Sequence, residues 1–366
     1  MLAQARSCRP SLILLLLLTL TTLTLLSLTW LSLPTGSRSA PAWTSIPEFN
    51  LVTRSRRITI VSMLHGARNN LYERALQSHR RHAERWGYGM DVLEHEIAAG
   101  YWNKPSYLLS IVVRELTRPV AERVEWLMWV DADSIILNPA IPLEIFLPPS
   151  SPSSSTNEIH LIATKDHKGL DTGIFFLRVH QWSVKMLIEV MAYPLYNPSA
   201  DLGAQTDQAA MEKVLTQDTY AANVTYLPRT WINTYEWAHG FEGARGNLLV
   251  HFPGLGEQQR SAHMSRWLDV VETGSEEWEV PVSETWYLND AEAFWERVAE
   301  GRRIVAEYEG RQRAMAKTAA PMSAGVKDVE TAVNELRKVL FEEPFEGELL
   351  RQRIEDWKVV PQRKSS

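Results

Sequence analysis

Two aspartates, Asp131 and Asp133, follow directly after the apolar run Trp126–Val130. A run that is hydrophobic at every position is typical of a strand covered on both faces. Since ligands of open α/β sheets bind beyond the carboxyl ends of the strands, we expect the two carboxylates to lie in a crevice there. Two oxygen ligands one residue apart can hold a divalent cation such as Mn²⁺ or Mg²⁺, which in turn can bind a diphosphate. Asp-x-Asp is usually a solvated loop or turn, and its position after a buried run strengthens the metal-site interpretation but leaves both alternatives open.

A histidine at the end of another apolar run is a candidate third ligand. His251 follows residues 248–250, which are all hydrophobic. A neutral imidazole is a good ligand for borderline metals, so His251 could complete an Asp/Asp/His set. The alternative is a hydrogen-bonded structural histidine.

Thr206, Asp207 and Gln208 stand at the predicted start of a helix. In one interpretation Thr206 is the N-cap and Asp207 interacts favourably with the helix dipole. In the other, Asp207 and Gln208 lie at the rim of a pocket, where a carboxylate stabilises positive charge developing on a substrate.

A glycine in the segment Asp171-Thr172-Gly173 precedes a further apolar run. Gly173 either lets the backbone pass close to a ligand or forms a turn. The sequence has no Gly-x-Gly-x-x-Gly after its first predicted strand and no Gly-Lys-Ser/Thr. The phosphates of a bound nucleotide would therefore have to be met by a metal.

The elements that must position these residues alternate between strand and helix. Apolar runs predict strands, and amphipathic spacing predicts helices between them. The alternation indicates an α/β domain with a mostly parallel sheet and helices on both faces. The predicted strands are residues 58–64, 88–96, 126–130, 160–164, 173–179 and 248–252, and the predicted helices are residues 72–86, 105–116, 182–191 and 207–215.

The N-terminal region predicts a membrane anchor. Residues 11–33 carry no charge over 23 positions, which is long enough to span a hydrocarbon core about 30 Å thick. A cleaved signal peptide has an apolar region of only ~7–15 residues and a small-residue cleavage site, which Arg38 interrupts here. Because Arg6 and Arg9 precede the span, we expect residues 1–10 to form a cytoplasmic tail.

The remainder of the chain is then expected in a secretory lumen. Residues 34–56 predict a stem and residues 57–275 the folded domain, followed by a charged, helical extension over residues 276–366 that we expect to be peripheral from about residue 301. In that compartment Asn223 is a valid N-glycosylation acceptor. The only cysteine, Cys8, precedes the anchor, so no disulfide is expected in the lumenal part. A net charge of −6 over 366 residues argues against nucleic acid as a partner.

In order, these segments resemble glycosyltransferase family 34, which includes fungal Golgi α-galactosyl- and α-mannosyltransferases and plant xyloglucan xylosyltransferases. The resemblance covers roughly residues 57–271. It rests on five blocks: ITIVSM, Trp102-Asn103-Lys104, WLMWVDADSIILNP, LDTGIFFLRVHQWS followed by TDQAAM, and LLVHFPG with a trailing HMSRWL.

The resemblance implies a GT-A fold and a type II enzyme of the Golgi membrane. Its reaction would transfer a hexose, galactose or mannose, from a nucleotide-diphosphate sugar to a glycan acceptor with retention of anomeric configuration. The donor would be UDP-galactose or GDP-mannose, the cofactor Mn²⁺ or another divalent cation, and a complex with other glycosyltransferases is a possible assembly.

The resemblance also implies roles for single residues. Asp131 and Asp133 would bind the metal and the donor, with His251 as the third protein ligand. Asp207 and Gln208 match the catalytic Asp-Gln pair beside the donor sugar. Gly173 matches the Asn-x-Gly turn near the donor. Asp171 is a departure from this pattern and from its donor-binding role, because the family usually has Asn at that position. A second departure is Leu255, where the family usually has Cys.

Two other classes of protein compete with this interpretation. A non-catalytic scaffold or sugar-binding subunit of a Golgi glycosyltransferase complex is favoured only by the Asp171 departure. A membrane-anchored hydrolase would need two carboxylic groups about 5–10 Å apart on either side of a bond, which Asp-x-Asp suits less well than a metal. No strong covalent nucleophile is evident in the sequence, which favours attack on the leaving-group side over double displacement.

Overall fold

The structure, a computed structural model, describes residues 58–66, 69–149, 154–318 and 326–359. The predicted cytoplasmic tail, anchor and stem all lie outside these residues. Within the described part of the chain, no helix combines the length and the apolar character needed to cross a bilayer.

A six-stranded sheet forms the centre of the domain, in the order β2-β1-β3-β6-β5-β7. β1 pairs in parallel with β2 and β3, and β5 pairs in parallel with β7. β6 alone is antiparallel to its neighbours, because only two residues join it to β5 and a parallel crossover needs a longer connection. The mostly parallel sheet is therefore confirmed. The strands are β1 (Ile58–Met63), β2 (Gly89–Leu93), β3 (Trp126–Val130), β5 (Leu161–Asp166), β6 (Gly169–Arg178) and β7 (Val224–Tyr226).

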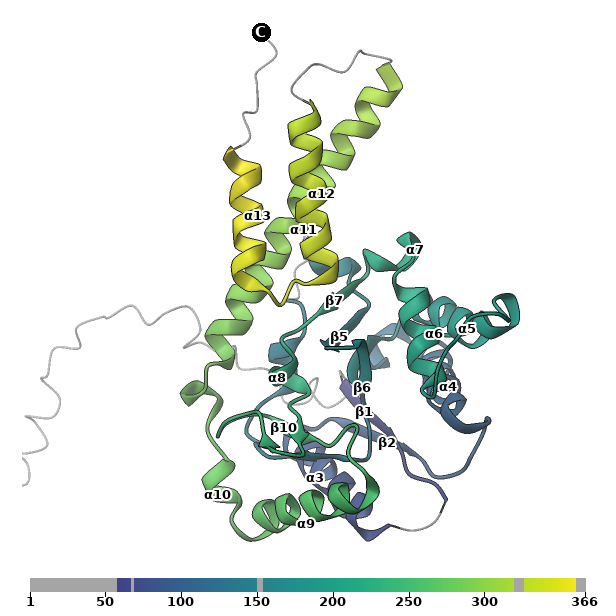
Figure 1. The fold of residues 1–366 in the computed structure, drawn as a ribbon, viewed down its shortest axis with the longest axis vertical. Helices are drawn as coiled ribbons and strands as arrows, with labels where there is room; N and C mark the ends of the chain where they lie inside the picture. The colour runs from purple at the N-terminus through teal and green to yellow at the C-terminus, as the bar shows by residue number, and fades with distance from the viewer. Residues whose placement is uncertain (1–57, 67–68, 150–153, 319–325, 360–366) are drawn as a thin grey trace, which may run out of the picture. The chain divides into compact units, whose positions relative to one another are not determined.

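Helices cover both faces of this sheet, as predicted (Figure 1). Successive side chains of β3 alternate between two core clusters, so that Met128 faces one cluster and Trp129 the other. The cluster of Trp129 also takes in buried side chains of α4, α5 and α6, whereas that of Met128 takes in α3, α8 and α11. The helices are α3 (Asn70–Trp86), α4 (Asn103–Leu116), α5 (Gln181–Tyr196), α6 (Thr206–Leu215), α8 (Arg229–Ile232), α9 (Glu257–Thr273) and α11 (Tyr287–Thr318).

The C-terminal part consists of α11, α12 (Val326–Glu342) and α13 (Gly347–Val359), which pack against one another (Figure 1). The start of α11 precedes residue 301, from which we expect a peripheral position. Tyr287 and Phe294 are buried in the same core cluster as β3, and the Tyr287 hydroxyl donates a hydrogen bond of 3.0 Å to the carbonyl of Trp231. This first stretch of α11 is thus part of the central core.

A small second sheet connects the end of β3 with the His251 segment. β10 (Leu249–His251) does not join the main sheet but pairs antiparallel with β4 (Ser134–Ile136), a strand that the sequence did not predict. In this register His251 lies opposite Ser134, the residue that directly follows Asp133 in the sequence. The remaining short elements are α7 (Asp218–Ala221), β8 (Glu236–Trp237), β9 (Gly240–Phe241) and α10 (Ser275–Trp278).

Candidate functional site

Asp131 and Asp133 lie on the connection between β3 and β4, at the carboxyl end of β3. The backbone N–H of Asp131 donates to the carbonyl of Gly173 at 2.8 Å, which extends the pairing of β3 with β6 by one residue. The hydroxyl of Ser134 donates to the Asp131 carbonyl at 2.7 Å, and Trp129 Nε1 donates to Asp131 Oδ1 at 2.7 Å. The strand and its turn therefore fix both the backbone and the carboxylate of Asp131.

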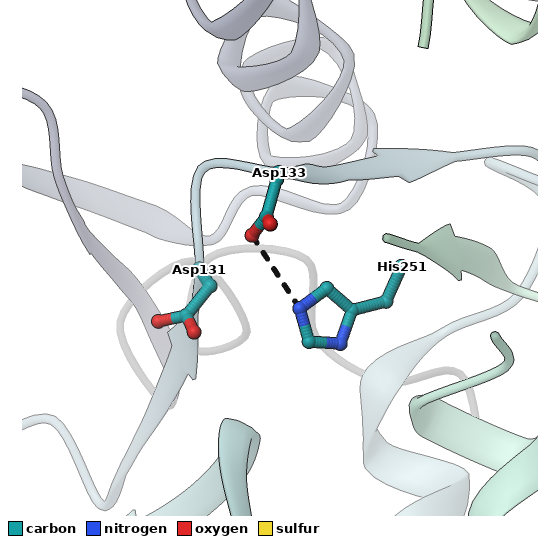
Figure 2. Close-up of side chains that lie close together, drawn as sticks. All are labelled: Asp131, Asp133 and His251. Atoms are coloured by element: carbon teal, nitrogen blue, oxygen red, sulfur yellow. Dashed lines mark ion pairs between the residues drawn. The ribbon is translucent and has the colours of Figure 1, made fainter. Parts of the chain in front are cut away.

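His251 reaches the same place from β10 (Figure 2). Its Nε2 lies 3.4 Å from Asp133 Oδ1, and one ligand atom from each of Asp131, Asp133 and His251 lies within 4.8 Å of the others. Carboxylate oxygens and an imidazole nitrogen are a suitable donor set for a divalent cation such as Mn²⁺. The structure thus brings together the three predicted metal ligands.

Gly173 makes room for the His251 ring. A Cβ atom on Gly173 would lie 2.4 Å from Cε1 of His251, which is too close for a real side chain, and 3.1 Å from Oδ1 of Asp171, which is a tight contact. Gly173 lies inside β6 and does not form a turn, so the turn interpretation is wrong. The group that lies close to Gly173 in the structure is the ring of His251, and an approach of this backbone to a bound ligand stays a prediction.

Asn233, which the sequence analysis missed, fixes the tautomer of His251. Its Nδ2 donates to Asp171 Oδ1 at 2.8 Å and to Thr164 Oγ1 at 3.0 Å, so its Oδ1 faces His251 Nδ1 at 2.7 Å. An amide oxygen only accepts hydrogen bonds, and the proton of a neutral His251 therefore resides on Nδ1. This leaves the Nε2 lone pair free on the side of the two aspartates, as a metal ligand requires.

The carboxylate of Asp171 is fully engaged within the protein. Oδ1 accepts from the backbone N–H of Gly173 at 2.7 Å and from Asn233, and Oδ2 accepts from the hydroxyl of Tyr235. Burial and the charge of Asp171 raise the pKa of Tyr235, which keeps this hydroxyl protonated as a donor. Asp171, the departure from the family pattern, thus supports Asn233 and through it His251.

Without a cation, the Asp133–His251 pair holds a proton. Burial lowers the pKa of His251, but the hydrogen bond with Asp133 and the negative charges around it outweigh this effect, so the net shift is upward. Burial likewise raises the pKa of Asp133, whereas His251 and the Arg260 guanidinium bring it below its usual range. A cation that binds Nε2 must displace the proton from His251.

Lys104 is a second functional residue that the sequence analysis did not single out, although it stood within a resemblance block. Its Nζ donates to the carbonyl of Thr172 at 2.9 Å and lies 3.2 Å from Asp131 Oδ1 and 3.9 Å from Asp207 Oδ2. Burial lowers the pKa of Lys104, but the nearby carboxylates more than offset this and raise it. A cation in the first turn of α4 opposes the helix dipole, and this was the signal that it has a charged partner.

Asp207 and Gln208 occupy different environments. Asp207 is 3% exposed, behind Lys104, and it does not lie at the pocket rim. Gln208 lines the pocket, and its Oε1 accepts from the backbone N–H and the hydroxyl of Thr172 at 3.1 and 3.0 Å. The expected N-cap role of Thr206 is wrong, because α6 begins at Thr206 and its N-cap is Gln205.

These residues surround one pocket at the carboxyl end of β3. Arg260, from the first turn of α9, closes its side with Nε 3.4 Å from Asp133 Oδ2. Four carboxylates and two permanent cations meet around the pocket, so a neutral His251 leaves two negative charges, which a divalent cation would match. The lining comprises Asp131, Asp133, Asp171, Gly173, Gln205, Gln208, His251, Pro253, Gly254 and Arg260.

The predicted glycosylation site lies away from this pocket. Asn223 precedes β7, and its side-chain amide donates to the carbonyl of Glu158 at 2.7 Å. Thr225 of the sequon is buried within β7. Modification of Asn223 stays a prediction.

With this site in place, comparison with known families gives a direct match. Residues 57–262 match the galactosyl transferase GMA12/MNN10 family, so the chain belongs to this glycosyltransferase family. The match confirms the resemblance to glycosyltransferase family 34 and includes every proposed metal ligand.

Individual relatives are similar to this chain over only part of their length. A probable glycosyltransferase 3 of Oryza sativa is 26% identical over 200 residues, which are 47% of this chain and 39% of the rice protein. A probable alpha-1,2-galactosyltransferase of Schizosaccharomyces pombe is 24% identical over 38% of this chain and 51% of its own length. Xyloglucan 6-xylosyltransferase 4 of Arabidopsis thaliana is 34% identical over 47% of this chain and 35% of its own length. The chain therefore spans about half or less of each of these relatives.

Among solved structures, a glycosyltransferase involved in glycosylation of the major capsid of PBCV-1 matches with a TM-score of 0.46 and 16% identity, covering 57% of this chain and 98% of that one. The galactosyltransferase LgtC matches with a TM-score of 0.40 and 9% identity, covering 62% and 98% of the two chains.

Proposed function

We propose that this protein transfers a hexose from a nucleotide-diphosphate sugar to a glycan acceptor, with a divalent cation held by Asp131, Asp133 and His251. The observation that carries the proposal is the cluster of these three ligands in a pocket of a glycosyltransferase-family chain. When bound, Mn²⁺ or a similar cation supplies charge stabilisation for the departing diphosphate.

The residues of the chain prepare the pocket for this chemistry. Asn233 and Asp171 orient His251, and Lys104 holds the carboxylate of Asp131 in place. Gln208 has its Oε1 committed to Thr172, and its Nε2 donates only one long hydrogen bond, of 3.4 Å, to Gln205 Oε1, so the second N–H of Nε2 is available to a substrate. Preorganised polar groups of this kind position a substrate without further rearrangement.

The geometry favours attack by the acceptor on the leaving-group side, with retention of configuration. Double displacement needs a carboxylate that can reach the sugar as a nucleophile. Asp207 is buried beside Lys104, and both oxygens of Asp171 accept hydrogen bonds from the protein. Neither carboxylate is therefore placed to act as a strong nucleophile.

The donors that we propose first are UDP-galactose, which would supply galactose, and GDP-mannose, which would supply mannose. The domain that binds them would have a GT-A fold. The name of the fission-yeast relative supports galactose, whereas that of the Arabidopsis relative points to xylose as a further donor to test. The uncharged span at residues 11–33 supports a single-pass type II protein of the Golgi membrane with a lumenal domain, and assembly with other glycosyltransferases fits that location.

The competing function is a non-catalytic scaffold or sugar-binding subunit. Its only support was the extra negative charge of Asp171, and this carboxylate accepts three hydrogen bonds from donors of the protein. All three metal ligands and Gln208 are retained, which a scaffold does not need.

A donor screen tests the proposal. The full-length chain in detergent would be incubated with UDP-galactose, GDP-mannose, UDP-xylose and other nucleotide sugars, with Mn²⁺ or with chelator. We expect release of the nucleoside diphosphate from one donor, dependent on Mn²⁺. No hydrolysis or transfer from any donor by a protein that still binds nucleotide would favour the scaffold.

A further inference from the structure

Arg260 has a guanidinium that the protein satisfies only in part. Its Nη2 donates to the carbonyl of Leu255 at 2.8 Å, and its Nη1 donates weakly to the hydroxyl of Tyr72 at 3.4 Å. Its Nε is buried, has no hydrogen-bond partner among the described residues, and lies 3.4 Å from Asp133 Oδ2. The contact with Asp133 is thus an ion pair without a good hydrogen bond.

The position of Arg260 is unusual in its surroundings. Within the described part of the chain it is the only arginine or lysine that lines the pocket, whose other charged members are Asp131, Asp133, Asp171 and His251. Lys104 lies deeper, with its ammonium committed to Thr172 and Asp131. Any anionic group that enters the pocket therefore finds one half-buried guanidinium, and guanidinium groups bind phosphate oxygens through strong, charge-assisted hydrogen bonds.

Arg260 and a bound cation compete for the same carboxylate. Asp133 is paired with Arg260 in the structure and is also a proposed metal ligand. A cation that binds alone must weaken this pair and bring its own charge close to the guanidinium. A diphosphate that arrives with the cation offers Arg260 a new anionic partner and removes that repulsion.

We propose that Arg260 is a diphosphate-binding residue that Asp133 holds in place until the cation and the nucleotide arrive, when it exchanges Asp133 for the diphosphate. The inference rests on the proposed function, because the diphosphate is that of the donor. Its consequence is coupling: nucleoside diphosphate and Mn²⁺ each strengthen the binding of the other, and part of this coupling passes through Arg260.

Binding measurements on Arg260→Met test the exchange, since methionine keeps much of the apolar stem without the charge. Calorimetry would measure Mn²⁺ alone, and UDP and GDP at saturating Mn²⁺, on the full-length protein in detergent. We expect the affinity for the nucleoside diphosphate to fall about 10- to 100-fold, as for loss of a charge-assisted contact. The affinity for Mn²⁺ alone should instead rise several-fold, because the competing cation is gone.

Two further variants separate this role from a structural one. Arg260→Lys keeps the charge without the planar fork, so it should retain the Mn²⁺ affinity of the wild type and lose less nucleotide affinity than Arg260→Met. Arg74→Met is the matched control, since Arg74 pairs with Asp269 and Glu272 at the other end of α9 and should change neither affinity.

The opposite signs of the two effects decide the outcome. Unchanged nucleotide affinity in Arg260→Met, or an equal loss of Mn²⁺ and nucleotide affinity, would overturn the exchange and leave the proposed function intact. If Arg260→Met does not fold, the same comparison is made on Arg260→Lys. A nucleotide affinity of Arg260→Lys equal to that of the wild type would then overturn the proposed contact between the planar guanidinium and the diphosphate. Wild-type protein that binds neither Mn²⁺ nor any nucleoside diphosphate would overturn the proposed function as well.

Discussion

The side-chain amide of Asn233 accepts a 2.7 Å hydrogen bond from Nδ1 of His251 and at the same time donates to Asp171. This amide links a carboxylate outside the proposed set of metal ligands to a histidine within that set. Partners of this kind set the tautomer and the orientation of a metal-binding imidazole. The metal affinity of the site should therefore depend on Asn233 although it is not itself a ligand.

Replacing Asn233 tests this dependence. Asn233→Ala leaves His251 Nδ1 and Asp171 without their shared partner, and we expect Mn²⁺ affinity to fall about 10- to 100-fold. Calorimetric titration with Mn²⁺ measures the change. Asn334→Ala on the exposed side of α12 is the control and should bind as the wild type does. Equal affinities in all three proteins would exclude the positioning role.

The affinity for Mn²⁺ should rise with pH. The pKa of His251 is raised in the metal-free site, and the metal binds only the neutral imidazole, so binding releases a proton while pH lies below that pKa. We expect the affinity to increase about tenfold per pH unit there and to level off above it, at a pH higher than about 6.5. Titration between pH 5.5 and 8.5, in buffers of different ionisation enthalpy, reports both the affinity and the released proton. An affinity that is constant over this range would contradict the ionised Asp133–His251 pair.

Two buried histidines should make the fold sensitive to acid. His79 and His82 are held neutral, with pKa values that burial lowers to about 3 and about 4, and their Nε2 atoms bond to Ser134 and to the carbonyl of Ile141. Since both folded pKa values lie below the unfolded value of 6.5, this stability is complete above pH 6.5 and is lost as pH falls from there toward pH 4. Each histidine should reduce the free energy of unfolding by about 2 kcal/mol at pH 5.

Urea unfolding at pH 7.5 and pH 5 measures this loss. In His82→Gln, whose side chain does not titrate, the difference between the two pH values should shrink by about 2 kcal/mol. His95→Gln changes an exposed histidine and should leave the difference as it is. The same pH difference in His82→Gln and in the wild type would show that burial of this histidine is not what limits acid stability.

Lys104 should stabilise the fold through its buried charge. Lys104→Met removes the cation and leaves Asp131 and Asp207 without it, and breaking a buried pair of this kind costs about 3–5 kcal/mol. Adding Asp207→Asn to this variant should recover part of the loss, because one uncompensated charge disappears. Thermal unfolding measures both changes. Lys358→Met, which breaks an exposed pair with Glu355, should cost less than 1 kcal/mol. No recovery in the double variant would show that Lys104 acts through packing instead of charge.

The central strand and two of the three proposed metal ligands could be predicted because their signals are local. The run Trp126–Val130 is hydrophobic at every position and two acids follow it at once, so strand and ligands lie within one short stretch. The ends of several strands shifted by one to four residues, as in β6, which begins at Gly169 and not at residue 173. Gly169 has a positive φ of 118° and completes the tight connection from β5, which hydrophobicity alone does not reveal.

The supporting residues could not be predicted because their contacts are distant in sequence. Asn233 and Arg260 reach the site from the segment after α8 and from α9, and neither stands in an apolar pattern or in a motif. The prediction of Thr206 as the N-cap of α6 was wrong because the helix begins at Thr206, with Gln205 as the N-cap and no side-chain capping hydrogen bond. Gln208 instead joins the start of the helix to β6, since its Oε1 accepts from Thr172 while its Nε2 donates to Gln205 Oε1.

The most direct test of the central claim is transfer by Asp133→Ala with the donor that the screen identifies, compared with the wild type at saturating Mn²⁺ and after chelation. Asp133 is a proposed metal ligand, so its loss should leave the departing diphosphate poorly compensated. We expect turnover to fall at least ~100-fold, equivalent to about 3 kcal/mol of transition-state stabilisation, and chelated wild type to fall similarly. Near-normal turnover in Asp133→Ala, or wild-type activity that chelation does not change, would contradict metal-assisted transfer at this site.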